Sequence, residues 1–147
     1  GMLVGDSSSF TFLVHAETEH NEYVADRPFR VNAGGVHAYA MMPDDMTSYL
    51  QEITPGDRVL IVDPEGCLST ATVGRTKVEV RPMLQVVASV NGKEGSLFLQ
   101  NAETIRLVRP DGSPVSVVGV REGDEILVHI DKAGRHFGMR VEETIDE

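Results

Sequence analysis

Helical periodicity is almost absent from this chain of 147 residues. Its apolar residues fall in short runs rich in Val, Ile and Leu, each bounded by Gly, Pro, Asp or Asn, which is the pattern of strands joined by turns. Helix is expected at most as a turn or two around 17–24. The runs expected to form strands are 10–16, 36–42, 48–50, 58–63, 68–74, 76–81, 83–91, 95–100, 104–109, 115–118, 125–131 and 135–143. The sequence therefore predicts an all-β fold.

An internal repeat indicates how these strands are organised. Residues 50–61 align with 117–128, and each copy places a Gly-Asp turn before an apolar strand. A second turn follows at 63–66 or 131–134, and 74–79 then resembles 138–142. Two related hairpin units predict a small barrel or sandwich, because a lone hairpin leaves an open edge and an uncovered face. We expect 1–45 to hold N-terminal strands and an Arg- and His-bearing segment, and 46–147 to form the repeat-containing, barrel-like domain.

Charge and cysteine content exclude several classes of function. The chain contains 13 basic and 23 acidic residues, which gives a net charge of −10. Nucleic acids and anionic membranes are bound mainly through basic surfaces, so neither is an expected partner. Cys67 is the single cysteine, which rules out an intramolecular disulfide. No run approaches the ~20 apolar residues of a membrane span, and we expect a cytoplasmic protein.

Two arginines stand out against this acidic background. Residues 1–57 contain nine carboxylates and only Arg27 and Arg30 as basic residues. The guanidinium group suits a carboxylate or a phosphate and keeps its charge. Asn32, Gly34-Gly35 and His37 follow, which is the composition of a pocket wall for an anion. From spacing alone, neutralisation of the acidic surface is an equally good interpretation.

Three further polar groups are candidates for a site. His15 and Glu17 share one face of a strand, which suits a metal or an acid/base pair, or a simple His–carboxylate hydrogen bond. The run 100–104 holds Gln100, Asn101 and Glu103 and is either a hydrogen-bonded turn or part of a site. Arg135-His136 is either an anion-binding, proton-carrying pair or an exposed pair on a strand.

Several motifs are absent from the sequence. It contains no G-x-G-x-x-G, no Walker sequence, no H-E-x-x-H and no C-x-x-C. Residue patterns alone thus indicate an acidic all-β domain with a polar pocket, and they name no reaction.

Longer strings carry a family resemblance. They are Gly1-Met2-Leu3-Val4-Gly5, Phe12-Leu13-Val14-His15-Ala16-Glu17-Thr18, Arg27-Pro28-Phe29-Arg30-Val31-Asn32-Ala33-Gly34, Val36-His37-Ala38-Tyr39, Leu99-Gln100-Asn101-Ala102-Glu103-Thr104-Ile105-Arg106-Leu107-Val108 and His136-Phe137-Gly138-Met139. In these strings the chain resembles the archaeal-type, second-class 3-dehydroquinate synthases. The resemblance implies an oxidoreductase activity, the NAD-dependent oxidative deamination and cyclisation of 2-amino-3,7-dideoxy-heptulosonate to 3-dehydroquinate. This reaction serves the shikimate pathway and aromatic amino-acid biosynthesis, or a related aminobenzoate pathway.

The resemblance also implies roles for the candidate residues. Arg27 and Arg30 would clamp the substrate carboxylate, and His37 or His136 would carry protons, one of them oriented by Glu103. The other substrate-binding candidates are Asn32, Gln100, Asn101 and Arg135. Alternatively His15, Glu17 and His37 would hold a divalent metal that polarises the ketone.

Members of this family are much longer, and the match begins in their middle. We therefore expect this chain to be inactive alone and to be completed by an N-terminal domain that NAD binding also requires. The alternatives are a stand-alone β-barrel that binds an anionic metabolite or a partner protein without catalysis, and a small metal-dependent enzyme. Homo-oligomerisation is left open by the sequence.

Overall fold

The computed structural model describes residues 1–16, 30–131 and 140–146, the last range by its backbone only. Within these ranges the chain is all-β, as predicted, and its helical structure is the single-turn 3₁₀ helix η1 (Leu50–Glu52). The strands are β1 (Met2–Ser7), β2 (Phe10–Val14), β3 (Tyr39–Met41), β4 (Thr47–Tyr49), β5 (Arg58–Val62), β6 (Leu68–Thr72), β7 (Met83–Val90), β8 (Lys93–Gln100), β9 (Arg106–Val108), β10 (Pro114–Ser116), β11 (Glu125–Ile130) and β12 (Arg140–Asp146).

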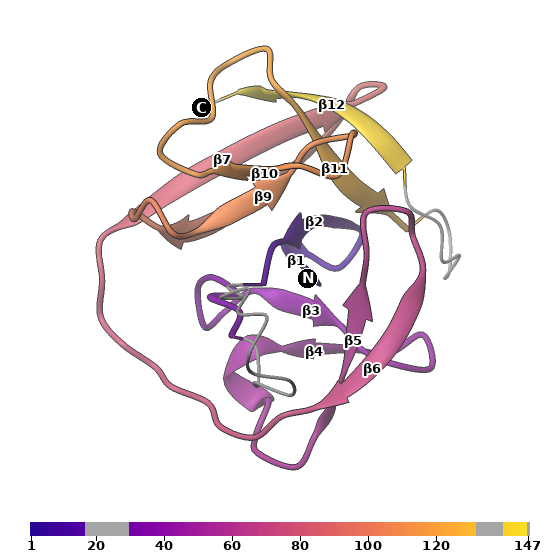
Figure 1. The fold of residues 1–147 in the computed structure, drawn as a ribbon, viewed down its shortest axis with the longest axis vertical. Helices are drawn as coiled ribbons and strands as arrows, with labels where there is room; N and C mark the ends of the chain where they lie inside the picture. Colours follow the sequence, from indigo (N-terminus) through magenta and orange to yellow (C-terminus); the bar gives the residue numbers. More distant parts are fainter. Residues whose placement is uncertain (17–29, 132–139, 147) are drawn as a thin grey trace, which may run out of the picture.

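Ten of these strands form one antiparallel sheet, in which the main path runs β4-β3-β1-β2-β11-β12-β7-β8 (Figure 1). β9 branches from β2 and pairs with β10, while β5 and β6 form a separate two-stranded sheet. The sheet curls so that β8, at one end of the path, packs against β1 and β2. Gly95 on β8 makes this approach possible, because a Cβ there would overlap the ring of Phe10.

The core is a layer of aliphatic and aromatic side chains enclosed by the curled sheet. β2 is buried along its whole length, and Phe12 is fully buried. β8 alternates instead: Gly95, Leu97 and Leu99 are buried, whereas Ser96, Phe98 and Gln100 are half-buried on the other face. This period of two leaves one face of β8 available for polar contacts.

Most strands lie where the sequence predicts them, but the prediction misses one strand of the structure and contains one strand that the structure lacks at those residues. β1 was not expected, because Gly5, Asp6 and the serines after them are typical of a loop. The run 76–81 was expected to be a strand, and this is wrong: it belongs to a long connection from β6 to β7 without ladder partners. The helical turn at 17–24 lies outside the described residues.

That connection, residues 73–82, follows the outside of the molecule (Figure 1). Lys77 Nζ lies 2.7 Å from Glu79 Oε1, and Arg81 Nη2 lies 3.3 Å from Glu79 Oε2, so the charged side chains pair along the segment. Val78 and Val80 are 72% and 96% exposed. Alternation alone therefore did not make a strand, because strand formation also needs a partner with free backbone groups.

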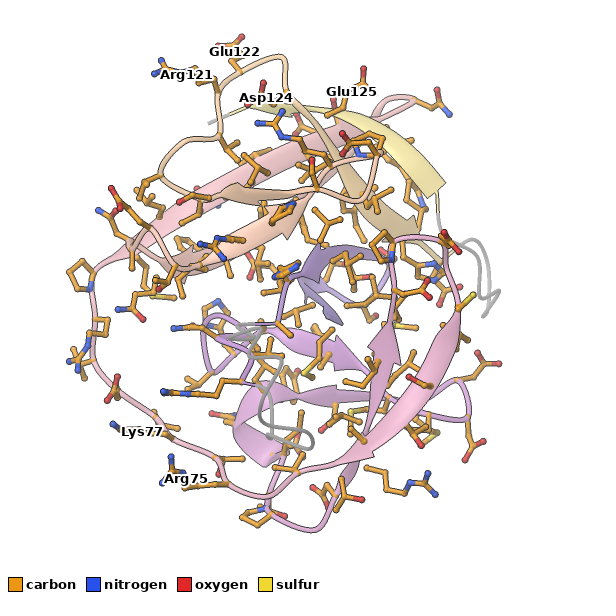
Figure 2. The ribbon with its side chains drawn as sticks, in the orientation of Figure 1. Arg75, Lys77, Arg121, Glu122, Asp124 and Glu125 are labelled. Atoms are coloured by element: carbon orange, nitrogen blue, oxygen red, sulfur yellow. The ribbon has the colours of Figure 1, made fainter. Side chains whose placement is uncertain are left out.

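The repeat is visible in its turns but not in its strands. The Asp57 carboxylate accepts the amide hydrogen of Thr54 at 2.9 Å, and the Asp124 carboxylate accepts that of Arg121 at 2.8 Å. The strands after these turns differ, since β5 belongs to the small sheet and β11 lies between β2 and β12 in the large one. Figure 2 shows Arg121 and Asp124 at one end of the molecule, and Arg75 and Lys77 of 73–82 at the other. An architecture of two equivalent hairpin units is not confirmed.

Candidate functional site along one face of β8

The segment that follows Arg30 lies against β8. Gly34 has a φ of +120°, and a Cβ there would lie 2.7 Å from the carbonyl oxygen of Phe98. Only glycine combines this backbone conformation with so close an approach. The Gly34-Gly35 pair noted in the sequence thus lets the chain lie directly on β8.

Asn32 is fixed at one end of this face. Its Nδ2 donates a hydrogen bond of 2.6 Å to Oε1 of Gln100, the last residue of β8. Both residues are substrate-binding candidates from the sequence, and the fold brings them together. The carbonyl of Asn32 and the amino group of Gln100 are not used in this bond. The first can accept a hydrogen bond from a ligand hydroxyl, and the second can donate one to it.

His37 lies further along the same face and contacts an acidic residue. Its Nε2 is 3.6 Å from Oδ1 of Asp6, and its ring packs edge-on against Phe98 with 5.9 Å between centroids. The Asp6 side chain is 21% exposed and that of His37 is 62% exposed. Ser96 Oγ donates to Oδ2 of Asp6 at 2.8 Å. A histidine beside a held carboxylate is the arrangement that general acid–base chemistry uses.

Asp6 and Ser96 were missed by sequence reasoning. Asp6 precedes the first run expected to form a strand, 10–16, and Ser96 is an ordinary residue of the strand expected at 95–100. Neither is near His37 in sequence, so no spacing pattern joins them. Glu103 was the orienting carboxylate expected from the resemblance, but it is exposed in the turn after β8.

The remaining candidates lie around this face or outside the described part. Arg30 is exposed, and its charge helps to lower the pKa of Glu79 after the larger effect of Lys77. Asn101 is exposed, and its backbone amide donates to the carbonyl of Pro82. Glu17, Arg27, Arg135 and His136 lie outside the described residues, so their predicted roles stay predictions.

His15 is positioned at the end of β2. Its backbone amide donates to the carbonyl oxygen of Arg106 at 2.8 Å. Burial lowers the pKa of the His15 imidazole, and the charges of the Gly1 amino group and Arg106 add to this effect. The metal set of His15, Glu17 and His37 stays a prediction, because Glu17 is not described.

One other group could ligate a metal by composition. Among the described residues, ligand atoms of Asp63, Glu65 and Cys67 lie within 4.8 Å of one another in an exposed turn. Oδ1 of Asp63 already accepts the amide hydrogens of Glu65 and Cys67, which explains the cluster as a turn. The charge of Asp63 raises the pKa of the Cys67 thiol, which disfavours the thiolate that a metal needs.

The described residues do not contain the structural motif that usually binds a nicotinamide dinucleotide. The usual dinucleotide-binding motif is a strand, a glycine-rich turn and a helix whose N-terminus faces the pyrophosphate. In residues 1–16, 30–131 and 140–146 the only helical element is the single turn η1. No helix in the described chain is long and apolar enough to cross a membrane.

The fold and the site together define an all-β domain with a polar face, built on β8, that joins an amide pair to a His–carboxylate pair. Comparison with known proteins identifies the family: residues 1–147 match 3-dehydroquinate synthase II C-terminal domain, and the chain belongs to this family. It is 58% identical over 147 residues to a 3-dehydroquinate synthase homolog of Aquifex aeolicus. It is 57% identical over 147 residues to a 3-dehydroquinate synthase of Methanospirillum hungatei.

These relatives are longer than the chain. All of the chain is matched in both, but it spans 44% of the Aquifex aeolicus protein and 45% of the Methanospirillum hungatei protein. No solved structure matches the chain.

Proposed function

We propose that this chain supplies the substrate-binding and proton-carrying residues of a 3-dehydroquinate synthase of the second class. The reaction is the NAD-dependent oxidative deamination of 2-amino-3,7-dideoxy-heptulosonate followed by cyclisation to 3-dehydroquinate. The observation that carries the proposal is the family match over all 147 residues, with the amide pair and the His–carboxylate pair on one face of β8.

The chemistry of such a substrate fits the groups on this face. A linear sugar acid carries a carboxylate, which suits the fixed positive charge of Arg30 with Arg27. Its hydroxyls suit the carbonyl of Asn32 and the amino group of Gln100, which are not used in the hydrogen bond between these two residues. Ring closure next to a carbonyl requires a proton to move at carbon, and the proposal gives this role to His37 because it lies beside the Asp6 carboxylate.

The cofactor belongs with the rest of the longer protein under this proposal. The described residues contain no dinucleotide-binding motif of this kind, so the proposal assigns no cofactor step to them. The exposure of Val78 and Val80 is consistent with a further part of the protein lying over the 73–82 segment. A requirement for divalent metal at His15, Glu17 and His37 is the alternative form of this proposal.

The test uses a fusion in which this chain replaces the matching C-terminal part of the Methanospirillum hungatei relative. Incubation with NAD and the aminoheptulosonate should give reduced cofactor by absorbance and 3-dehydroquinate by mass spectrometry. Added chelator decides whether a metal takes part. In the fusion, His37→Ala should lower kcat by about 10²-fold or more, since that is the usual contribution of a general acid or base.

Arginine variants separate substrate binding from general electrostatics. Arg30→Ala should raise KM in the fusion, whereas the matched control Arg121→Ala, at an exposed position in the turn before β11, should leave turnover unchanged. An active fusion that is indifferent to both His37→Ala and Arg30→Ala contradicts the proposed roles. An inactive fusion that still binds the substrate favours a non-catalytic binding domain.

A further inference from the structure

The Asp6 carboxylate has an oxygen directed at His37 that is buried and has no other partner. Oδ1 of Asp6 is inaccessible to solvent and accepts no hydrogen bond in the described structure, while Oδ2 accepts from Ser96. Nε2 of His37 lies 3.6 Å from this oxygen, just beyond hydrogen-bond length. A buried carboxylate oxygen without a donor is costly, so a small approach of the imidazole would be favourable.

This geometry selects one tautomer of the neutral histidine. A hydrogen on Nε2 would face the buried oxygen of Asp6, whereas a lone pair on Nε2 would face another lone pair. The proton of a neutral imidazole resides on the nitrogen whose partner accepts it, and the other nitrogen is then the base. Asp6 therefore favours Nε2–H and leaves the lone pair on Nδ1.

The space beside Nδ1 is kept open by a glycine. A Cβ on Gly35 would lie 2.9 Å from Cε1 and 3.1 Å from Nδ1 of His37. The φ of Gly35 is outside the left-handed region, so its backbone conformation does not itself require glycine. What the missing side chain provides is room at the nitrogen that Asp6 leaves basic.

We propose that Asp6 and Ser96 are positioning residues that direct Nδ1 of His37 to the substrate as the proton-accepting atom, and that Gly35 keeps this atom accessible. The inference rests on the proposed function for the identity of the substrate. Ser96 holds the carboxylate, the carboxylate orients Nε2–H, and Nδ1 is the ring nitrogen left to take a proton from a bound molecule. In this step the substrate's C–H or N–H bond breaks, its electron pair stays on the substrate, and the proton forms the Nδ1–H bond.

The first experiment reads the tautomer without needing activity. Nitrogen-15 NMR of the 147-residue chain, at a pH where His37 is neutral, should show protonated Nε2 and unprotonated Nδ1. Asp6→Ala should shift this ratio towards that of a free imidazole, and Asp6→Asn should largely preserve it, because an amide carbonyl can still accept from Nε2. Glu94→Gln, an exposed carboxylate change on β8, is the matched control. A predominant Nδ1–H tautomer in the unaltered chain would overturn the proposal.

The second experiment uses the fusion enzyme. Asp6→Ala should lower kcat about 10²-fold with little change in KM, Asp6→Asn should recover part of that loss, and Ser96→Ala should have a smaller effect. Gly35→Ala should lower kcat, because its Cβ would lie 2.9 Å from Cε1 and 3.1 Å from Nδ1 of His37 and would displace the imidazole from its position. The melting temperature of each variant separates these effects from unfolding.

The outcomes distinguish the two proposals. If the fusion is active and Asp6→Ala is as active as the parent, the inference on Nδ1 is refuted and the proposed function stands. If the fusion is inactive but the Nε2–H tautomer depends on Asp6, the positioning by Asp6 stands and the proposed function fails.

Discussion

Gly34→Ala should be strongly destabilising, because the glycine combines two features that a side chain opposes. Its φ of +120° is a conformation that residues with a Cβ rarely adopt. The added methyl would also lie 2.7 Å from the carbonyl oxygen of Phe98, in the middle of the β7–β8 ladder. That oxygen belongs to a paired strand, so the 30–38 segment must move instead.

The magnitude follows from these two costs. Backbone strain of this kind costs about 1–3 kcal/mol, and forcing an extra methyl into a packed contact adds about 1–3 kcal/mol. Since partial relaxation lowers the sum, we expect a loss of about 2–4 kcal/mol in the free energy of unfolding. For a chain of this length each kcal/mol lowers the melting temperature by about 3 °C, which gives a fall of about 6–12 °C.

Urea and thermal unfolding of the 147-residue chain measure this directly, with Gly74→Ala as the matched control. Gly74 has no atom within 4 Å of a built Cβ and no positive φ. Its replacement should therefore change stability by between zero and a gain of about 1 kcal/mol. In the same sample, Gly34→Ala should weaken the contact of Asn32 with Gln100, seen as a shift of their side-chain amide NMR signals. Equal stability of the two variants would refute the argument that the 30–38 segment is pressed onto β8.

Two further predictions concern the core and the pH dependence of stability. Phe12→Ala should lower the free energy of unfolding by about 3–5 kcal/mol in urea, because Phe12 is fully buried. Val78→Ala, at an exposed position, should change it by no more than about 0.5 kcal/mol. Similar values for both variants would contradict the assigned core. His15 has a lowered pKa in the folded state, mainly through burial, so the unfolded chain binds its proton more readily. The free energy of unfolding should therefore fall as the pH drops through the ordinary histidine pKa of about 6.5. His15→Gln should flatten this part of the curve of stability against pH. An unchanged slope would count against burial of the His15 imidazole.

The strands show what pattern alone can predict and where it fails. β7 and β8 follow from their alternation and from the Asn91-Gly92 turn, which are local features. β1 was missed because Gly5 and Asp6 are local signals of a loop, and its pairing with β2 and β3 is what makes it a strand. The 76–81 run has the alternation of a strand and lacks a partner. In both cases the outcome depends on which backbone lies alongside, and single-residue patterns carry no information about this.

The all-β class, the family and half of the residues of the candidate site follow from the amino-acid sequence alone. Long matching strings and the order of apolar and turn residues are properties of the chain, so Asn32, Gln100 and His37 could be selected from the sequence. Which groups meet is instead a property of the folded chain: Asn32 with Gln100, and His37 with Asp6 and Ser96. The physical reason is that the curling of the sheet places β8 against β1, which brings Asp6 next to Ser96, and that Gly34 lets a distant segment lie on β8. Sequence spacing cannot encode such contacts, because they are fixed by strand pairing and close packing between remote parts of the chain.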